Sequence, residues 1–142
     1  MGKTVAVVLA RRTFRSLPFA LGAIFLACPV MADDGPSLIG TWTGKTNTIG
    51  DVHGLRTRDR TVHITEQTDR RFRGYFVYED GRKDFFGIVF PDNVSFGWVS
   101  PASKGQVQGR ILSADHIAAC YLESGEQATA GCSDLMRTSA KP

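Results

Sequence analysis

The sequence predicts an all-β protein: a small antiparallel meander barrel of about eight strands, preceded by an N-terminal export segment. Three observations predict it. Apolar and polar residues alternate with a period of two in several short runs, as in strands with one buried face. Turn residues separate these runs, which start roughly 10–12 residues apart, as in all-β barrels and sandwiches. No window of roughly 11 residues after residue 32 shows a convincing helical period.

Length and composition indicate one globular domain that does not bind nucleic acid. The 142 residues suit a single domain, and 42% hydrophobic with 22% charged residues excludes disorder. The 17 Lys and Arg outnumber the 14 Asp and Glu, but four of the basic residues precede residue 32. The rest of the chain therefore carries a net charge of −1, from 13 basic and 14 acidic residues. A phosphate-binding domain would keep a positive excess.

Residues 1–32 have the layout of a secretory signal peptide. A basic stretch precedes 15 mostly apolar residues, LPFALGAIFLACPVM, a run that is short for a membrane span. Ala32 supplies a small residue at the expected cleavage site, so that Asp33 becomes the new N-terminus. This layout predicts a periplasmic or secreted protein with no stable membrane span after cleavage. An uncleaved anchor or a buried helix is the alternative.

The export route and lipidation stay open. Arg11-Arg12 resembles the twin-arginine export pattern, although paired arginines also occur in ordinary basic signal segments of the Sec route. Phe25-Leu26-Ala27-Cys28 partly resembles a lipobox, with Phe25 where Leu is usual. A lipid anchor on Cys28 is therefore an alternative to a freely diffusing protein.

A short lead at residues 33–37 precedes a single β-barrel domain at residues 38–142. The first expected strand is Leu38–Lys45, which follows the Pro-containing lead. The second is Arg60–Glu66, where Val62 and Ile64 alternate with polar neighbours. The connection between them, Asn47–Asp59, contains two glycines and is predicted to be a lid or a mobile loop.

Turn residues delimit the other strands. Asp80-Gly81 and Pro91-Asp92-Asn93 are examples of residues that tolerate tight turns. Alternation of Val94, Phe96 and Trp98 with small residues marks one of these strands clearly. The expected strands are Phe72–Glu79, Asp84–Phe90, Val94–Ser100, Gln106–Leu112, His116–Glu123 and Ala128–Arg137.

A glycine recurs in the middle of four of these strands. RFRGYF, FFGIVF, SFGWV and VQGRIL place it at positions 74, 87, 97 and 109. A mid-strand glycine often marks a bulge or a sharp bend, which barrel closure requires. We predict curvature at these positions rather than a duplicated binding unit.

Cys120 and Cys132 are the two cysteines after residue 32, and an even pair in an exported domain predicts a disulfide. If the last two strands form a hairpin in which the two cysteines are paired, the residue midway between the cysteines, Glu126, marks the centre of the turn. Ser124–Gln127 are turn residues. The two cysteines are therefore expected to face each other across neighbouring strands.

Gly40-Thr41-Trp42 resembles the Gly-x-Trp motif of the calycin group, which includes lipocalins and avidins. In those barrels the Trp closes one end, and a basic residue of the last strand lies over its ring. The resemblance implies structural closure by Gly40, Trp42 and Arg137, with a cation–π contact between the last two. Gly44 stands where biotin binders carry a ligand-contacting Asn, so biotin binding is not implied.

The C-terminal stretch contains two further distinctive segments, GRILSADHI and CYLESGEQATAGCSDLMR. Together with the GTW start and the Gly-containing meander, they are similar to a group of small, uncharacterised exported bacterial β-barrel proteins, and the similarity spans most of residues 38–137. These proteins share a CY…C…L.R ending. The similarity implies the same fold and brings no established activity.

Alternation predicts that six aromatic side chains share the inner face: Phe72, Phe76, Phe86, Phe90, Phe96 and Trp98. An eight-stranded barrel has room for side chains or one small ligand, and this many rings favours a packed core over a deep pocket. If a cavity exists, its expected lining is Phe76, Phe86, Phe96 and Trp98, which would bind a small apolar or amphipathic ligand.

No motif predicts an enzyme, a cofactor or a metal site. His53, His63 and His116 are scattered, and Asp51 with His53 supplies only two metal ligands. The sequence contains no Gly-x-Ser-x-Gly elbow and no Gly-rich phosphate loop between a strand and a helix. A hydrolase assembled from distant residues is recognised by geometry alone and stays a minor alternative.

Arginines gather at positions 56, 58 and 60 and again at 70, 71 and 73. They are candidates for a basic edge that meets an anionic partner. We favour a different interpretation, protection of a sheet edge against aggregation, because Asp59, Glu66 and Asp69 neutralise part of the charge.

Two functions follow from these observations. The first is a small exported binding barrel, non-catalytic, that holds a small apolar or amphipathic ligand. The second is a packed-barrel interaction module or inhibitor that contacts an envelope or extracellular protein through its loops, particularly Asn47–Asp59. The ligand, the partner and the oligomeric state are left open.

Overall fold

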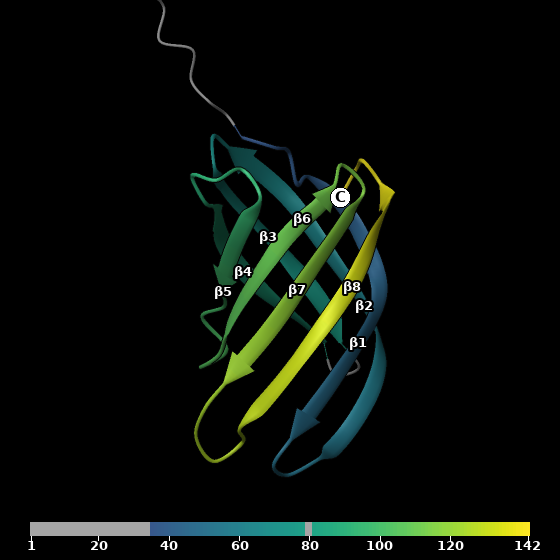
Figure 1. The fold of residues 1–142 in the computed structure, drawn as a ribbon, viewed down its shortest axis with the longest axis vertical. Helices are drawn as coiled ribbons and strands as arrows, with labels where there is room; N and C mark the ends of the chain where they lie inside the picture. Colours follow the sequence, from purple (N-terminus) through teal and green to yellow (C-terminus); the bar gives the residue numbers. More distant parts are fainter. Residues whose placement is uncertain (1–34, 79–80) are drawn as a thin grey trace, which may run out of the picture. The chain divides into compact units, whose positions relative to one another are not determined.

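The computed structural model describes residues 35–78 and 81–142, which form a closed antiparallel barrel of eight strands in chain order (Figure 1). Strand β8 pairs with β1 and closes the sheet. This confirms the predicted fold class. The predicted signal peptide, residues 1–32, lies outside the described residues, as do residues 33 and 34. The strands are β1 (Gly40–Gly50), β2 (Gly54–Thr68), β3 (Arg71–Tyr78), β4 (Gly81–Val89), β5 (Ser95–Val99), β6 (Gln106–Ser113), β7 (His116–Glu123) and β8 (Thr129–Ser139).

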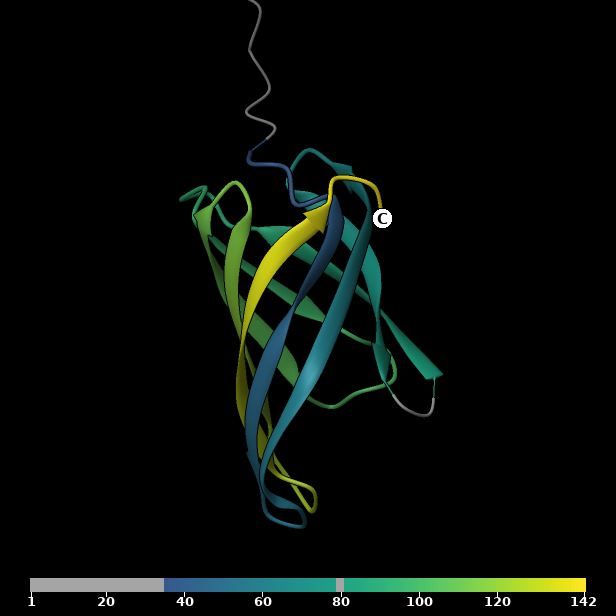
Figure 2. The ribbon, with the colours of Figure 1, turned by 90° about the vertical axis from the view of Figure 1, so that its right-hand side faces the viewer.

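The longest hairpin, β1–β2, replaces the lid that was predicted for Asn47–Asp59. Pairing runs without interruption from Gly40 opposite Ile64 to Gly50 opposite Gly54, so only residues 51–53 form the turn. Threonine and isoleucine favour extended backbone here, and Gly54 accepts the φ of 61° that the turn requires. The prediction of a lid or a mobile loop is therefore wrong, because both ends of this segment are paired strand. The hairpin instead lengthens the barrel wall beside the β7–β8 hairpin (Figure 2).

The end of the barrel where β1 begins is closed by Leu38, Trp42 and Arg137. Leu38 and Trp42 are almost completely buried, and Trp42 Nε1 donates a hydrogen bond to the Leu38 carbonyl at 2.9 Å. The Arg137 guanidinium carbon lies 4.3 Å from the centroid of the Trp42 ring. The cation–π contact is therefore confirmed. Leu38 and Ile39 were expected in the first strand, but they precede it, because Leu38 packs into the core and Arg137 binds the Ile39 carbonyl.

Next to this closed end, aromatic and aliphatic side chains fill the barrel. The Phe96 and Trp98 rings stack with centroids 5.4 Å apart, and Phe72 meets both rings edge-on. Offset stacking and edge-to-face contacts are favourable arrangements for buried rings. The fully buried members of this core include Val62, Ile64, Phe72, Phe85, Val89, Phe96, Ile117 and Leu135.

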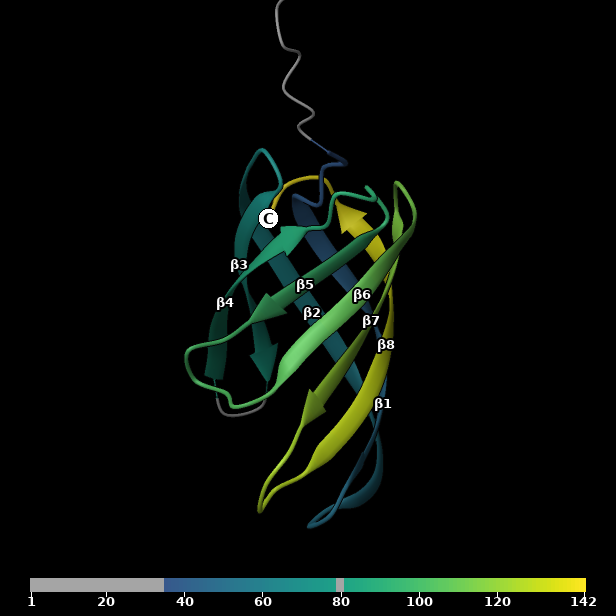
Figure 3. The ribbon, with the colours of Figure 1, turned by 60° about the vertical axis from the view of Figure 1, so that its left-hand side comes forward.

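The face that β4 presents to the interior differs from the prediction. Phe85 and Val89 are buried, whereas Phe86 is 56% exposed and Phe90, just after the strand, is 37% exposed. The prediction of Phe86 and Phe90 on the inner face is wrong. A run of adjacent apolar residues allows either phase of alternation, and the register settles it, because Val89 lies opposite the buried Phe96 of β5. Figure 3 shows β4 and β5 side by side.

The glycines on the inner face make room for aromatic rings. A Cβ atom on Gly109 would lie 2.3 Å from the Phe96 ring, and one on Gly87 would lie 2.5 Å from the Phe72 ring. One of the three register irregularities adjoins Gly74, because the shift between Ile64 and Glu66 of β2 begins at the Ile64–Gly74 pair. The other two fall near Trp42 and Ile111. The predicted irregularity therefore occurs beside Gly74, on the partner strand β2, whereas no register shift falls at Gly87, Gly97 or Gly109. At Gly87 and Gly109 the missing side chain allows close packing.

The predicted disulfide is confirmed. Cys120 of β7 lies directly opposite Cys132 of β8, and the two are bonded with Cα atoms 4.0 Å apart. The bond ties the β7–β8 hairpin together at a wall of the open half of the barrel.

Candidate functional site

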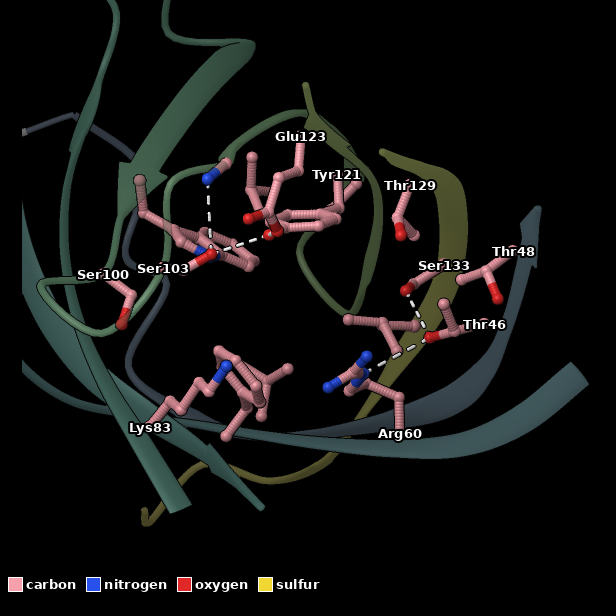
Figure 4. Close-up of a pocket in the computed structure, with 17 residues that line it drawn as sticks. Thr46, Thr48, Arg60, Lys83, Ser100, Ser103, Tyr121, Glu123, Thr129 and Ser133 are labelled. Atoms are coloured by element: carbon pink, nitrogen blue, oxygen red, sulfur yellow. Dashed lines mark hydrogen bonds between the residues drawn. The ribbon is translucent and has the colours of Figure 1, made fainter. Parts of the chain in front are cut away.

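A cavity of about 280 Å³ occupies the half of the barrel beyond the aromatic core, toward the β1–β2 and β7–β8 hairpins. Figure 4 shows its lining in close-up. All eight strands and the β5–β6 loop contribute side chains to its wall. The interior is therefore neither fully packed nor fully hollow: one half is core and the other half is a pocket.

The inner part of the cavity is apolar. Phe76 and Trp98 supply aromatic surface, and smaller apolar residues complete it: Val62, Val107, Ala119 and Leu135. Two of the four predicted ligand-binding residues, Phe76 and Trp98, line this cavity. Phe96 is fully buried in the core and does not reach it, while Phe86 lies on the outer face.

One polar wall is built around Arg60 of β2. Its Nε donates to the Thr46 hydroxyl at 3.4 Å, and its guanidinium carbon lies 4.9 Å from the Phe76 ring centroid. The Thr46 and Ser133 hydroxyls are hydrogen-bonded at 2.6 Å. Burial lowers the pKa of Arg60, and the neighbouring charge of Arg58 lowers it further. An arginine stays charged in proteins, so this wall holds a partly desolvated cation.

The opposite polar wall is built around Tyr121 of β7. Its hydroxyl donates to the Glu123 carboxylate and is hydrogen-bonded to the Ser103 hydroxyl at 2.6 Å. The Tyr121 ring packs against Gly105, and only a glycine fits at this position, because a Cβ atom on residue 105 would lie 2.4 Å from the ring. Burial raises the pKa of Tyr121, and the hydrogen bond to Glu123 raises it further. The phenol is therefore neutral and anchored at neutral pH.

Lys83 of β4 adds a second cation to the lining, with its ammonium 5.6 Å from the Tyr78 ring centroid. Arg60, Lys83 and Glu123 are thus the charged residues that line the cavity in the described part of the chain. Figure 4 shows Arg60 beside Thr46 and Ser133, with Glu123 across the cavity from them.

The cationic wall was missed by sequence reasoning, although a signal was present. Arg56, Arg58 and Arg60 alternate in phase with Val62 and Ile64, so a continuous strand turns all five toward one face. The expected interpretation as edge protection is wrong for β2 and β3, because both strands have hydrogen-bonded neighbours on each side in the closed barrel.

The histidines lie apart from this cavity. His63 stacks on Tyr75 with ring centroids 4.6 Å apart, His116 is hydrogen-bonded to Asp134, and His53 lies in the β1–β2 turn. Within residues 35–78 and 81–142, no group of three or more His, Cys, Asp or Glu side chains is placed to hold a metal ion. In the same residues, no helix is long and apolar enough to cross a membrane.

Comparison with known proteins gives likenesses to designed barrels. No protein-family model matches the sequence, and no curated protein matches it. Among solved structures, a redesigned β-barrel matches 71% of this chain and 91% of its own, at 15% identity and a TM-score of 0.45. EF1p2_mFAP2b bound to DFHBI matches 71% and 94% at 16% identity and 0.45. The redesigned barrel mFAP0 bound to DFHBI matches 70% and 98% at 18% identity and 0.43. At these values the likenesses assign neither a family nor a ligand to this chain.

Proposed function

We propose that this protein is an exported, non-catalytic binding barrel that holds one small amphipathic molecule in its cavity. The observation that carries the proposal is the cavity of about 280 Å³, with aromatic and aliphatic surface inside and charged and hydroxyl groups toward the hairpins. Pockets for small ligands commonly have about 300–1,000 Å³ and a mostly apolar lining with a few polar groups. The size favours a small ligand, and the division of its surface favours an amphipathic one.

Export to the periplasm or the medium is supported by the signal-like residues 1–32 and by the Cys120–Cys132 bond. Disulfides persist in oxidising compartments. A non-catalytic role is supported by how the cavity hydroxyls are used. Thr46 pairs with Ser133, and Tyr121 binds Glu123 and Ser103, so these groups are arranged to recognise a polar group.

Native mass spectrometry tests the proposal on the protein purified without denaturation from the periplasm or medium of its own organism. A retained small molecule that is lost on collisional activation is the expected result. In parallel, the fluorescent neutral probe N-phenyl naphthylamine is titrated into the purified protein, and its emission is expected to rise and saturate.

Two matched variants locate the binding. Ala119→Phe puts a ring into the cavity and is expected to abolish probe binding, because Ala119 lines it. Ala118→Phe puts the same ring on the outer face of the same strand and is expected to leave binding unchanged. A bare mass together with no saturable probe binding would contradict the proposal.

The alternative function, contact with an envelope or extracellular protein, is favoured by one observation on the outside of the barrel. Phe86, Ile88 and Val99 of β4 and β5 are 56%, 46% and 42% exposed and line a second, shallow hollow. Exposed apolar patches often mark protein contacts. Co-purification of one protein that is lost in Phe86→Ser, with no ligand in the cavity, would favour this alternative over the binding barrel.

A further inference from the structure

The guanidinium of Arg60 lines the cavity without an acidic partner among the residues that the structure describes. The ion pairs of the described residues involve other arginines and lysines, and no carboxylate of these residues lies within ion-pairing distance of Arg60. Its polar contact is the single hydrogen bond from Nε to Thr46. The two terminal nitrogens of the guanidinium, with four N–H donors, are thus left for another acceptor. A partly buried cation without a counter-ion is costly.

The hydroxyl pair beside Arg60 offers one more donor to the same place. Thr46 accepts a hydrogen bond from Arg60 and shares another with Ser133. Each hydroxyl has one proton, so whichever of the two donates within the pair, the other keeps a proton that is free to donate. Arg60 and this pair therefore present several donors to one side of the cavity.

The surrounding charges favour the same kind of ligand. Lys83 adds a second cation to the lining, and Arg56 and Arg58 follow Arg60 on the same face of β2 toward the hairpin end. Glu123 is the one acidic residue among the described lining residues. Its carboxylate accepts a hydrogen bond from the Tyr121 hydroxyl, and it lies across the cavity from Arg60 (Figure 4). Opposite walls of one cavity thus carry opposite charge, and the cationic wall holds the unfilled donors.

We propose that the ligand is a small amphipathic organic anion whose acidic group binds Arg60 and the Thr46–Ser133 pair while its apolar part lies against Phe76 and Trp98. This inference rests on the proposed binding function and adds the chemical class and the orientation of the ligand. Guanidinium groups bind planar acidic groups through two parallel hydrogen bonds, which suits this geometry.

A pair of fluorescent probes that differ by one acidic group tests the inference. Anilinonaphthalene sulfonate and N-phenyl naphthylamine share the same aromatic frame, and only the first carries a sulfonate. Each is titrated into the wild-type protein. We expect the anionic probe to bind at least tenfold more tightly than the neutral probe, a difference of about 1.4 kcal/mol in binding free energy. We also expect the Ala119→Phe variant to lose binding of the anionic probe.

Charge variants then identify the group responsible. Arg60→Gln is expected to weaken binding of the anionic probe at least tenfold more than binding of the neutral probe. Arg73→Gln makes the same change in net charge on the outer face of β3, where the side chain is 69% exposed, and is expected to affect neither probe. If circular dichroism shows that Arg60→Gln does not fold, Lys83→Gln replaces it, and binding of the anionic probe is again expected to weaken more than binding of the neutral probe.

The outcomes separate the two proposals. Binding of the neutral probe with no preference for the anionic one, and no effect of Arg60→Gln or Lys83→Gln, would overturn the anion inference and leave the binding barrel standing. Failure of both probes to bind in a saturable way, together with a bare mass in native mass spectrometry, would overturn the binding barrel itself.

Discussion

Replacing Arg137 by methionine tests how the closed end of the barrel is held. The substitution keeps most of the apolar stem and removes a guanidinium that lies 4.3 Å from the Trp42 ring centroid. The same group donates hydrogen bonds to the backbone carbonyls of Ser37, Ile39 and Ala114. Arg137 thus connects the segment before β1 with the β6–β7 turn and with the buried indole.

The magnitude follows from these contacts. The cation–π contact contributes about 0.5–2 kcal/mol, and hydrogen bonding to each of the three carbonyls contributes about 1 kcal/mol. Water replaces part of the hydrogen bonding once the guanidinium is gone, because these carbonyls lie near the surface. We therefore expect Arg137→Met to lower the free energy of unfolding by about 2–4 kcal/mol.

Urea unfolding at neutral pH, followed by tryptophan fluorescence with the disulfide intact, measures this loss. Arg110→Met is the matched control, since Arg110 is exposed on the outer face of β6, and its effect is expected to stay within about 0.5 kcal/mol. A loss below about 1 kcal/mol for Arg137→Met would refute the view that this side chain holds the end closed.

Three further predictions concern the wall and the cavity. Reduction of the Cys120–Cys132 bond, which spans 12 residues, is expected to cost about 3 kcal/mol in urea unfolding with and without reductant; an unchanged midpoint would contradict this. Gly109→Ala is expected to cost about 1–3 kcal/mol in thermal unfolding, because its Cβ would lie 2.3 Å from the buried Phe96 ring; a wild-type melting temperature would show that the ring has room to move. The raised pKa of Tyr121 means that its contribution to stability is complete below pH 10.0 and is lost as the pH rises through the raised value. When urea unfolding is measured as a function of pH, Tyr121→Phe is expected to remove this part of the stability loss at alkaline pH. A pH profile of the unfolding free energy that is the same as in the wild type would contradict the prediction.

Local patterns in the sequence were sufficient for much of the fold. Alternation in β2 and β5 and the turn residues between strands predicted eight strands in a meander, because the period of two is a property of each strand alone. The disulfide followed from the position of the turn midway between Cys120 and Cys132, which depends on one hairpin. The contact of Arg137 with Trp42 joins the two ends of the domain, and the calycin resemblance rather than any local pattern implied it.

Other features depended on pairing between strands. The adjacent Phe85 and Phe86 allow either ring to face inward, and only the register with neighbouring strands buries Phe85. The glycines between Asn47 and Asp59 suggested a loop, but pairing along both strands extended the hairpin to Gly50 and Gly54. Hydrogen bonds to a neighbouring strand outweigh weak local preferences of this kind.

The sequence by itself determined the strand order, the phase of the clearly alternating strands, the disulfide and the presence of an export-like segment. The tertiary structure alone decided that the barrel is half core and half cavity, and that Arg60, Thr46 and Ser133 meet on one wall of that cavity. The physical reason is that a strand pattern records which side is buried but carries no information on what lies across the barrel. That arrangement depends on closure of the sheet, which brings β8 beside β1 and so places Ser133 of β8 next to Thr46 of β1 and Arg60 of β2.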